Sequence, residues 1–303
     1  MICLCIGICQ LQSVSEILNI SEIFKSKYTK VVYYQVFNIT EDKMKHILEN
    51  EVKNADLILS QPVSEKYKGT DIFSTKKLRE TALKYGKKHY IISNCYFTGY
   101  DPNPFQTTNE YGEILHFNNI SYIPSMCFDE LLDKNIEKSC IKWCNIDYYN
   151  KSQLEKNINN TLNELKSRES DVFGNGYGID IKISDFIEEN YKKVKLFHTY
   201  NHPTNVLLIE LSRRVMNKIG LPMERITLTK ELLGDVSIPP PPSVYYGYNM
   251  HFEKYPKFHI KGKECSTQEA MQIFSDVIQN YYDDQKLIEK WKSCISYGLT
   301  KIS

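Results

Sequence analysis

The sequence predicts an α/β fold: an N-terminal, mostly parallel, Rossmann-like sheet with helices on both faces, followed by a largely helical C-terminal part. Over about the first hundred residues, short apolar runs of strand length alternate with longer segments whose apolar residues recur at helical spacing. Beyond residue 125, helical spacing dominates. A repeated strand-helix order is typical of a parallel sheet whose crossover helices cover both faces.

The N-terminal elements follow from this alternation and from local capping signals. Thr40 and either Ser74 or Thr75 are typical helix N-caps, and Gly86 is a typical helix end. No Gly-x-Gly-x-x-Gly follows the first strand, so the usual dinucleotide-binding fingerprint is missing. The expected strands are 2–8, 31–36, 56–59 and 89–92, and the expected helices are 11–24, 40–52 and 74–85.

The remaining chain is expected to be mainly helical after a loop-rich segment at 100–124. Four consecutive prolines at 239–242 predict a stiff connector. We therefore expect an α/β parallel-sheet region at 1–125 and a mainly helical region at 126–303 that completes the same site, as one domain or two. The expected helices are 152–166, 180–191, 203–219, 267–282 and 284–296, with a short strand at 195–198.

Composition narrows the class of protein. The 38 Lys and Arg residues balance 37 Asp and Glu residues, which gives no general attraction for nucleic acid or an anionic membrane. There is no run of eighteen apolar residues, and the N-terminal apolar run has neither the basic flank nor the length of a signal peptide. We expect a cytoplasmic protein without an integral membrane segment, whose nine cysteines are mostly free thiols. The spacing of Cys3, Cys5 and Cys9 does not suit zinc, and no metal is expected.

The junction after the first strand is the strongest candidate for a site. In Gly7-Ile8-Cys9-Gln10, Cys9 lies where the strand ends and the helix begins. Open α/β sheets place their sites there, and a helix N-terminus favours negative charge, so we expect a depressed thiol pKa and an active-site position for Cys9. Alternatively, Cys9 is a small buried side chain in a cysteine-rich strand. Gln10 and Gln61 each follow a strand, where a side-chain amide would donate to an oxyanion or a sugar hydroxyl.

His202 is the second candidate. Asn201-His202-Pro203-Thr204 is expected to start a helix with Pro203 in the first position. The helix N-terminus would keep His202 neutral, which is the form that a general base needs. The alternative is a histidine that caps or packs.

A third candidate is the pair Arg168 and Glu169, which precedes the glycine-rich segment 173–178. The backbone amides of such a loop can surround an anion, with Arg168 forked onto a phosphate. Glu169 or Asp171 would instead orient His202. The alternative is a solvated Arg-Glu ion pair.

Six segments, taken in order, resemble the WcbI-type family of acetyltransferases of capsular polysaccharide biosynthesis. Ile8 stands where that family has Asn. Within these segments, the aromatic residues Tyr96, Phe97 and Tyr100 would offer ring faces to an adenine or a sugar, or anchor a loop. The segments are Gly7–Gln10, Ala55–Gln61, Tyr96–Pro102, Ser167–Asp171, Asp185–Ile187 and Thr199–Pro203.

The resemblance implies an acyl-CoA-dependent O-acetyltransferase that acts on a sugar in capsular or cell-surface polysaccharide biosynthesis, with coenzyme A or acetyl-CoA as substrate. His202 would deprotonate the sugar hydroxyl or Cys9, and Gln10 would help to stabilise the oxyanion. The alternatives are an SGNH-like esterase or hydrolase and a non-catalytic CoA- or nucleotide-binding protein. The expected partners are a small-molecule acyl donor and a saccharide acceptor, with no nucleic acid. The expected cofactor-binding residues are Gln61, Tyr100, Arg168, Glu169 and Asn201.

Overall fold

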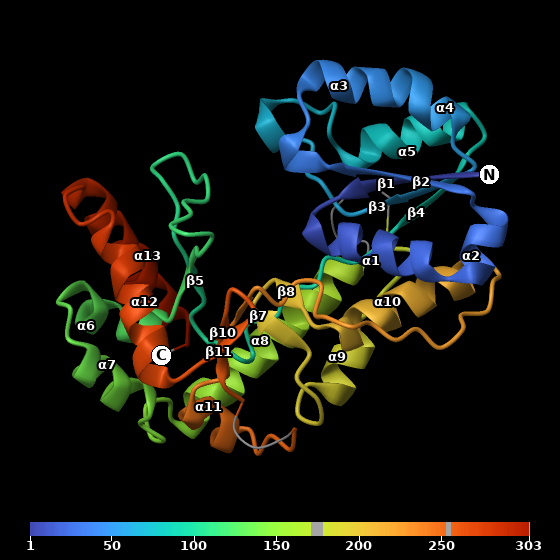
Figure 1. Cartoon of the computed structure of the whole chain (residues 1–303). Helices are drawn as coiled ribbons and strands as arrows, with labels where there is room; N and C mark the ends of the chain where they lie inside the picture. Colours follow the sequence, from blue (N-terminus) through green and yellow to red (C-terminus); the bar gives the residue numbers. More distant parts are fainter. Residues whose placement is uncertain (171–177, 253–255, 303) are drawn as a thin grey trace. The chain divides into compact units, whose positions relative to one another are not determined.

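The computed structural model describes residues 1–170, 178–252 and 256–302 (Figure 1). The chain forms two compact units, and each of them is made of three separate stretches of the sequence. The first unit comprises Met1–Cys95, Glu164–Glu188 and Pro203–Leu233, and the second comprises Tyr96–Asn163, Glu189–His202 and Gly234–Ser303. The boundary predicted at residue 125 falls inside the second unit.

The first unit is built on a four-stranded sheet in which every neighbouring pair is parallel. Its order is β2-β1-β3-β4, so the chain moves to one side of β1 and then to the other. Open α/β sheets bind ligands where the strand order reverses in this way, at the carboxyl ends of the strands. The predicted parallel-sheet fold is confirmed. The strands are β1 (Ile2–Gly7), β2 (Lys30–Gln35), β3 (Leu57–Ser60) and β4 (Lys88–Ile91).

Helices cover both faces of this sheet (Figure 1). One face carries α3 (Glu41–His46), α4 (Val52–Asn54) and α5 (Thr75–Lys84), and the other carries α1 (Cys9–Ile20) and α10 (Asn205–Lys218). A π-helical turn joins α3 to α4. Apolar side chains between the sheet and the α3–α5 face are withdrawn from water, and each such side chain contributes roughly 1.5–3 kcal/mol. Among them are Leu4, Ile6, Met44, Ile47, Ile58 and Leu78.

The capping signals act as expected. The Thr40 hydroxyl accepts a hydrogen bond from the Lys43 N–H at the start of α3, and Ser74 does the same for Lys77 at the start of α5. The helix predicted over 11–24 is interrupted at Ser21, whose hydroxyl caps a separate helix, α2 (Glu22–Lys27). Ser21 therefore starts a new helix where the apolar spacing alone predicts continuation.

The second unit contains more β-structure than predicted. Its strands have two or three residues each, too few to show a two-residue periodicity. The prolines at 239–242 do not all belong to a connector, since Pro242 is the first residue of α11. The strands are β5 (Phe105–Gln106), β6 (Tyr122–Ile123), β7 (Phe197–Thr199), β8 (His202–Pro203), β9 (Val236–Ser237), β10 (Phe258–Ile260) and β11 (Lys263–Cys265). Apart from α10, the helices from α6 onward are α6 (Phe128–Leu132), α7 (Ile136–Trp143), α8 (Lys151–Glu169), α9 (Ser184–Asn190), α11 (Pro242–Gly247), α12 (Thr267–Gln279) and α13 (Gln285–Ile302).

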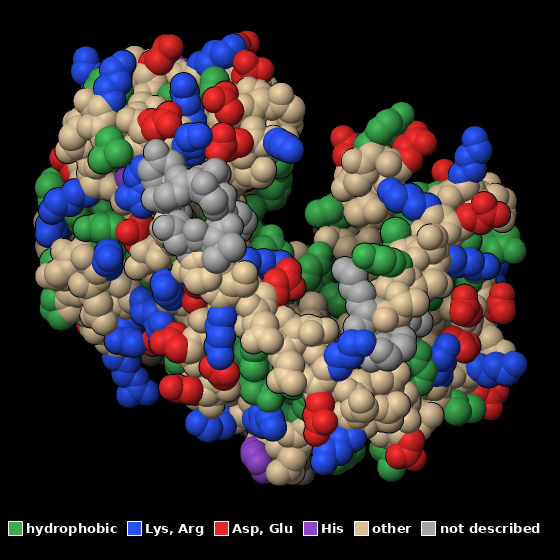
Figure 2. All heavy atoms as spheres, turned by 180° about the vertical axis from the view of Figure 1, so that it is seen from behind, with side chains coloured by type: hydrophobic (Ala, Val, Ile, Leu, Met, Phe, Trp, Pro, Cys, Tyr) green, Lys and Arg blue, Asp and Glu red, His purple; other side chains and the backbone are tan. Residues whose placement is uncertain are grey.

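The surface charges are mixed in sign. Figure 2 shows Lys and Arg side chains interspersed with Asp and Glu side chains over the visible face. In the described part of the chain, every helix is too short or too polar to cross a membrane.

Candidate functional site

Cys9 is the first residue of α1, directly beyond the carboxyl end of β1. Ile8 is the N-cap residue, with an extended backbone (φ −97°, ψ −176°) and no side-chain hydrogen bond to the helix. An isoleucine has no side-chain oxygen to cap with, so the start of α1 presents its first N–H groups without a side-chain cap. Such a helix start can accept a negative charge, including one that develops during a reaction.

The predicted depression of the Cys9 pKa is wrong in its net direction. Burial raises the pKa of the Cys9 thiol, and the N–H groups of Gln10 and Cys9 lower it by less. The helix N-terminus acts as expected, but the cost of placing a thiolate among packed neighbours is larger. Cys9 is therefore mainly a thiol at neutral pH.

Two buried glutamine amides hold the junction that carries Cys9. The Gln61 Oε1 accepts from the Ile8 N–H at 3.0 Å, and the Gln61 Nε2 donates to the Gln10 Oε1 at 3.2 Å. Gln10 pairs with both backbone groups of Cys95, accepting at 2.9 Å and donating at 2.8 Å. These amides link the ends of β1 and β3 to the segment after β4. Gln10 and Gln61 are 0% and 2% exposed and bind protein atoms, which fits positioning better than direct oxyanion contact.

Gly7 permits this packing. A Cβ atom at Gly7 would lie 2.8 Å from the Gln61 Oε1 and equally close to the Leu11 side chain. Both distances are shorter than packed atoms tolerate, so any side chain here would displace Gln61.

Tyr33 also contacts the junction, and sequence reasoning missed it. Its hydroxyl donates to the Ile8 carbonyl at 2.9 Å and lies 3.3 Å from the Gly7 carbonyl. A tyrosine within a strand is ordinary, so no local signal distinguishes Tyr33 from a packing residue.

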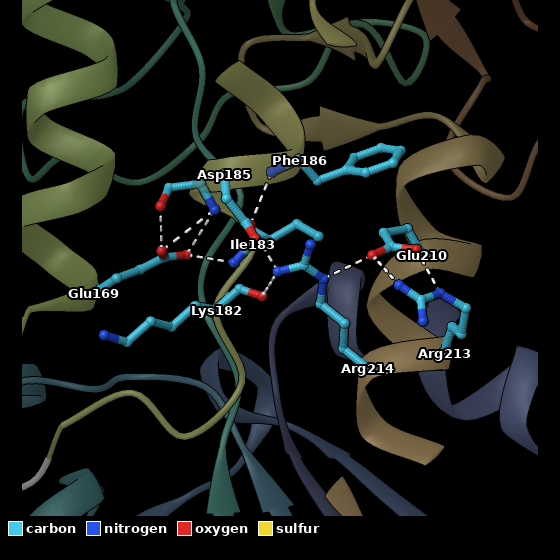
Figure 3. Close-up of polar contacts among 9 residues, drawn as sticks. Glu169, Lys182, Ile183, Asp185, Phe186, Glu210, Arg213 and Arg214 are labelled. Atoms are coloured by element: carbon cyan, nitrogen blue, oxygen red, sulfur yellow. Dashed lines mark hydrogen bonds and ion pairs between the residues drawn. The ribbon is translucent and has the colours of Figure 1, made fainter. Parts of the chain in front are cut away.

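Glu169 is a structural cap in the first unit (Figure 3). Its Oε1 accepts from the N–H groups of Ile183 at 2.7 Å and Ser184 at 3.1 Å, and its Oε2 accepts from the Ser184 hydroxyl at 2.5 Å. Glu169 is 2% exposed, which excludes the alternative of a solvated Arg168–Glu169 pair, while the predicted binding role of the two residues stays a prediction. Arg168 pairs instead with Glu164 on the same helix.

Arg213 and Arg214, two basic residues of α10, are engaged by carboxylates (Figure 3). Arg214 binds Asp185 at 2.6 Å and the Lys182 carbonyl at 2.9 Å. Both arginines also bind Glu210, with Arg213 in a two-bond fork at 2.8 and 2.7 Å. This network ties α9 to α10.

Tyr100 and Phe97 are core residues of the second unit. The Tyr100 hydroxyl donates to the Tyr191 carbonyl at 2.7 Å and accepts from the Leu196 N–H at 3.2 Å. Its ring meets that of Phe97 edge-on at 5.1 Å. Both residues are buried and line a small cavity, and the binding role expected of Tyr100 stays a prediction.

His202 belongs to β8 in the second unit, and not to a helix start as predicted. The helix α10 begins two residues after Pro203, with Thr204 as its N-cap residue in an extended conformation. Burial, and then the nearby His198, lowers the pKa of His202 to about 4, while Asp235 raises it by less. The imidazole is therefore neutral at pH 7, but through desolvation and not through a helix dipole.

Asn201 and His202 share a tyrosine partner. The Tyr122 hydroxyl donates to the Asn201 Oδ1 at 2.8 Å and lies 3.4 Å from the His202 Nε2. The Thr199 hydroxyl also donates to the Asn201 Oδ1, at 3.1 Å. Cys9 lies in the first unit and His202 in the second, and their cooperation stays a prediction.

The predicted anion-binding loop at 173–178, with Asp171, falls almost wholly on 171–177, outside the described residues. Among the residues that are described, no group of three or more His, Cys, Asp or Glu side chains is placed to hold a metal ion.

The comparisons with known proteins agree with the sequence resemblance. The family model for the polysaccharide biosynthesis enzyme WcbI matches residues 2–224. The chain belongs to the WcbI family. No curated protein matches it. The family's description as a polysaccharide biosynthesis enzyme agrees with the prediction of an enzyme, and the matched residues include Cys9, Gln61 and His202.

One solved structure shares the fold over nearly the whole chain. It is the native form of WcbI, described as a novel polysaccharide biosynthesis enzyme and as lacking a disulfide bond between coenzyme A and one of its cysteines. The match has a TM-score of 0.77 and 21% identity, and covers 99% of this chain and 98% of that one.

Proposed function

We propose that this WcbI-family protein is an acyl-CoA-dependent O-acetyltransferase that acts on a sugar hydroxyl in capsular or cell-surface polysaccharide biosynthesis, within the cytoplasm. The observation that carries the proposal is the start of α1: a cysteine and N–H groups without a side-chain cap, at the strand-order reversal of a parallel sheet. The description of the solved WcbI structure, which mentions coenzyme A and a cysteine of that protein, supports the choice of acyl donor.

The chemistry that we propose for this helix start is stabilisation of charge. When a sugar oxygen attacks a thioester, the carbonyl oxygen becomes an oxyanion before the C–S bond breaks. The N–H groups of Cys9 and Gln10 would donate to this oxyanion, and removal of one such donor typically costs about 10²- to 10³-fold in rate. Gln10 and Gln61 would act through the position of this turn.

The proton movements favour direct transfer over a covalent intermediate. Cys9 is mainly a thiol, because its pKa is raised by burial, so an acyl-enzyme on its sulfur would need prior deprotonation. His202 is neutral near pH 7 and would accept the proton of the sugar hydroxyl, then return it to the CoA thiolate. A ping-pong route through Cys9 remains the alternative within the same reaction.

The test is turnover of acetyl-CoA with a panel of sugars, followed by mass spectrometry of CoA and of the acetylated product. His202→Ala should lower kcat by about 10²- to 10⁴-fold, as expected for loss of a general base. Cys9→Ala should cost about tenfold or less, through positioning. An inactive Cys9→Ala variant together with a trapped acyl-thioester in the wild-type protein would establish the ping-pong route.

The other outcomes identify the rival functions. Release of acetate without any sugar indicates an esterase or hydrolase. Tight CoA binding without turnover indicates a non-catalytic binding protein, and absence of CoA binding at millimolar concentration would refute the proposal.

A further inference from the structure

The backbone of Ile8 is held from two directions by side chains of neighbouring strands. On one side, the Gln61 Oε1, just beyond β3, accepts from the Ile8 N–H at 3.0 Å. On the other, the Tyr33 hydroxyl, on β2, donates to the Ile8 carbonyl at 2.9 Å. Tyr33 on β2 is paired with Cys5 on β1 in the parallel register, and its hydroxyl reaches the turn that follows β1.

Fixing the Ile8 carbonyl also fixes the Cys9 N–H. The two groups belong to one planar, trans peptide unit and point in opposite directions. Rotation of this unit would turn the N–H away from the Cys9 sulfur and weaken the hydrogen bonds that the Ile8 carbonyl accepts from Leu11 at 3.0 Å and Gln12 at 3.3 Å.

We propose that Tyr33 is a positioning residue for Cys9: through the Ile8 carbonyl, it orients the first N–H groups of α1 toward the reacting sulfur or thioester oxygen. This inference rests on the proposed function only for what is bound at the turn. The orientation itself is a property of the unliganded protein.

The chemistry of a tyrosine suits this task. Its ring has two rotatable bonds, so a packed phenol holds its hydroxyl in place at low entropic cost. Burial, and then the negative charge that Cys9 carries as a thiolate, raises the pKa of Tyr33, so the hydroxyl is protonated and can donate at neutral pH.

The test compares Tyr33→Phe with Tyr34→Phe. Both changes remove one hydroxyl from adjacent residues of β2, but the Tyr34 hydroxyl donates to Glu51, away from the Cys9 turn. The pH dependence of Cys9 alkylation by iodoacetamide, read by mass spectrometry, should shift to higher pH in Tyr33→Phe. The rate at pH 8 should fall about threefold to tenfold, the range expected for loss of one hydrogen bond. Tyr34→Phe should match the wild type.

The pH midpoint separates positioning from a general loosening, since easier access changes the rate without moving the midpoint. Cys95 is fully buried and should remain unlabelled in each sample, which reports that the fold is intact. Should Tyr33→Phe label Cys95, Gln61→Met provides the second variant, because it removes the acceptor of the Ile8 N–H and should move the midpoint in the same direction. A wild-type midpoint in the folded variant overturns the proposal.

This experiment contains no coenzyme A, so it can fail independently of the proposed function. Isothermal titration of the wild-type protein with CoA provides the separate readout. A shifted midpoint without CoA binding refutes the function and retains the positioning role, and the reverse result refutes the positioning role alone.

Discussion

Glu169→Gln tests whether this carboxylate holds the fold or takes part in binding. In the native protein, its two oxygens accept hydrogen bonds from the N–H groups of Ile183 and Ser184 and from the Ser184 hydroxyl. Glutamine keeps one acceptor oxygen and replaces the other with an NH₂ group, which then faces donors of Ser184. At least one buried donor therefore loses its acceptor.

The magnitude follows from the loss of a charged acceptor. Hydrogen bonds to charged groups are worth about 1.5–3 kcal/mol, so the free energy of local opening around the start of α9 should fall by about that amount. Because about 1.4 kcal/mol corresponds to a factor of ten, the amides of Ile183 and Ser184 should exchange with solvent roughly 10- to 150-fold faster.

Hydrogen exchange followed by mass spectrometry measures this effect directly. Glu164→Gln is the matched control, since Glu164 pairs with Arg168 on the surface and its side chain is 60% exposed. The control should leave exchange near Ser184 within about threefold of the wild-type rate. Wild-type exchange in Glu169→Gln together with loss of CoA binding would refute the structural role and place Glu169 among the ligand-binding residues.

Three further changes test other parts of the structure through urea unfolding. Gly7→Ala should lower the free energy of unfolding by about 1–3 kcal/mol, because the added Cβ displaces Gln61. Burial, and then Arg79, lowers the pKa of His89 to about 3. The stability that the neutral form of His89 contributes is therefore complete above about pH 6.5 and is lost as the pH falls toward 3. At pH 4 the free energy of unfolding should be lower by roughly 3 kcal/mol, and a His89→Gln variant should not show this pH-dependent loss. Burial raises the pKa of Asp101 to about 7, so the stability that its protonated form contributes is lost as the pH rises from about 3.8 to 7. At pH 8, Asp101→Asn should therefore have a free energy of unfolding above that of the wild type, by at most about 4 kcal/mol. Equal or lower stability of the variant would contradict this.

The sheet and its helices were predictable because their signals are local. A parallel strand that is buried on both faces reads as a continuous apolar run, as in β1, and Thr40 and Ser74 mark helix starts by their own side chains. The short strands of the second unit have no such signal. The pairing of Ile260 with Val236 depends on contacts between residues far apart in sequence, which local periodicity does not encode.

The position of Cys9 was predictable from the strand-turn-helix pattern, but the direction of its pKa shift was not. Desolvation depends on what packs over the thiol, which is a property of the folded protein. Glu169 shows the same limit, because the N–H groups that it caps lie fourteen and fifteen residues further along the chain. The neutral state of His202 was expected from a helix that the structure does not place there, and burial supplies it instead.

Protection of Cys9 by coenzyme A tests the central claim most directly. The wild-type protein is treated with iodoacetamide at pH 8, with and without CoA at a saturating concentration, and labelling of each cysteine is followed by mass spectrometry. If the thiol end of CoA binds at the start of α1, CoA should slow the labelling of Cys9 by at least about tenfold and leave the exposed Cys144 and Cys294 unchanged. Labelling of Cys9 at an unchanged rate, under conditions where calorimetry shows bound CoA, would place the acyl donor elsewhere and contradict the account.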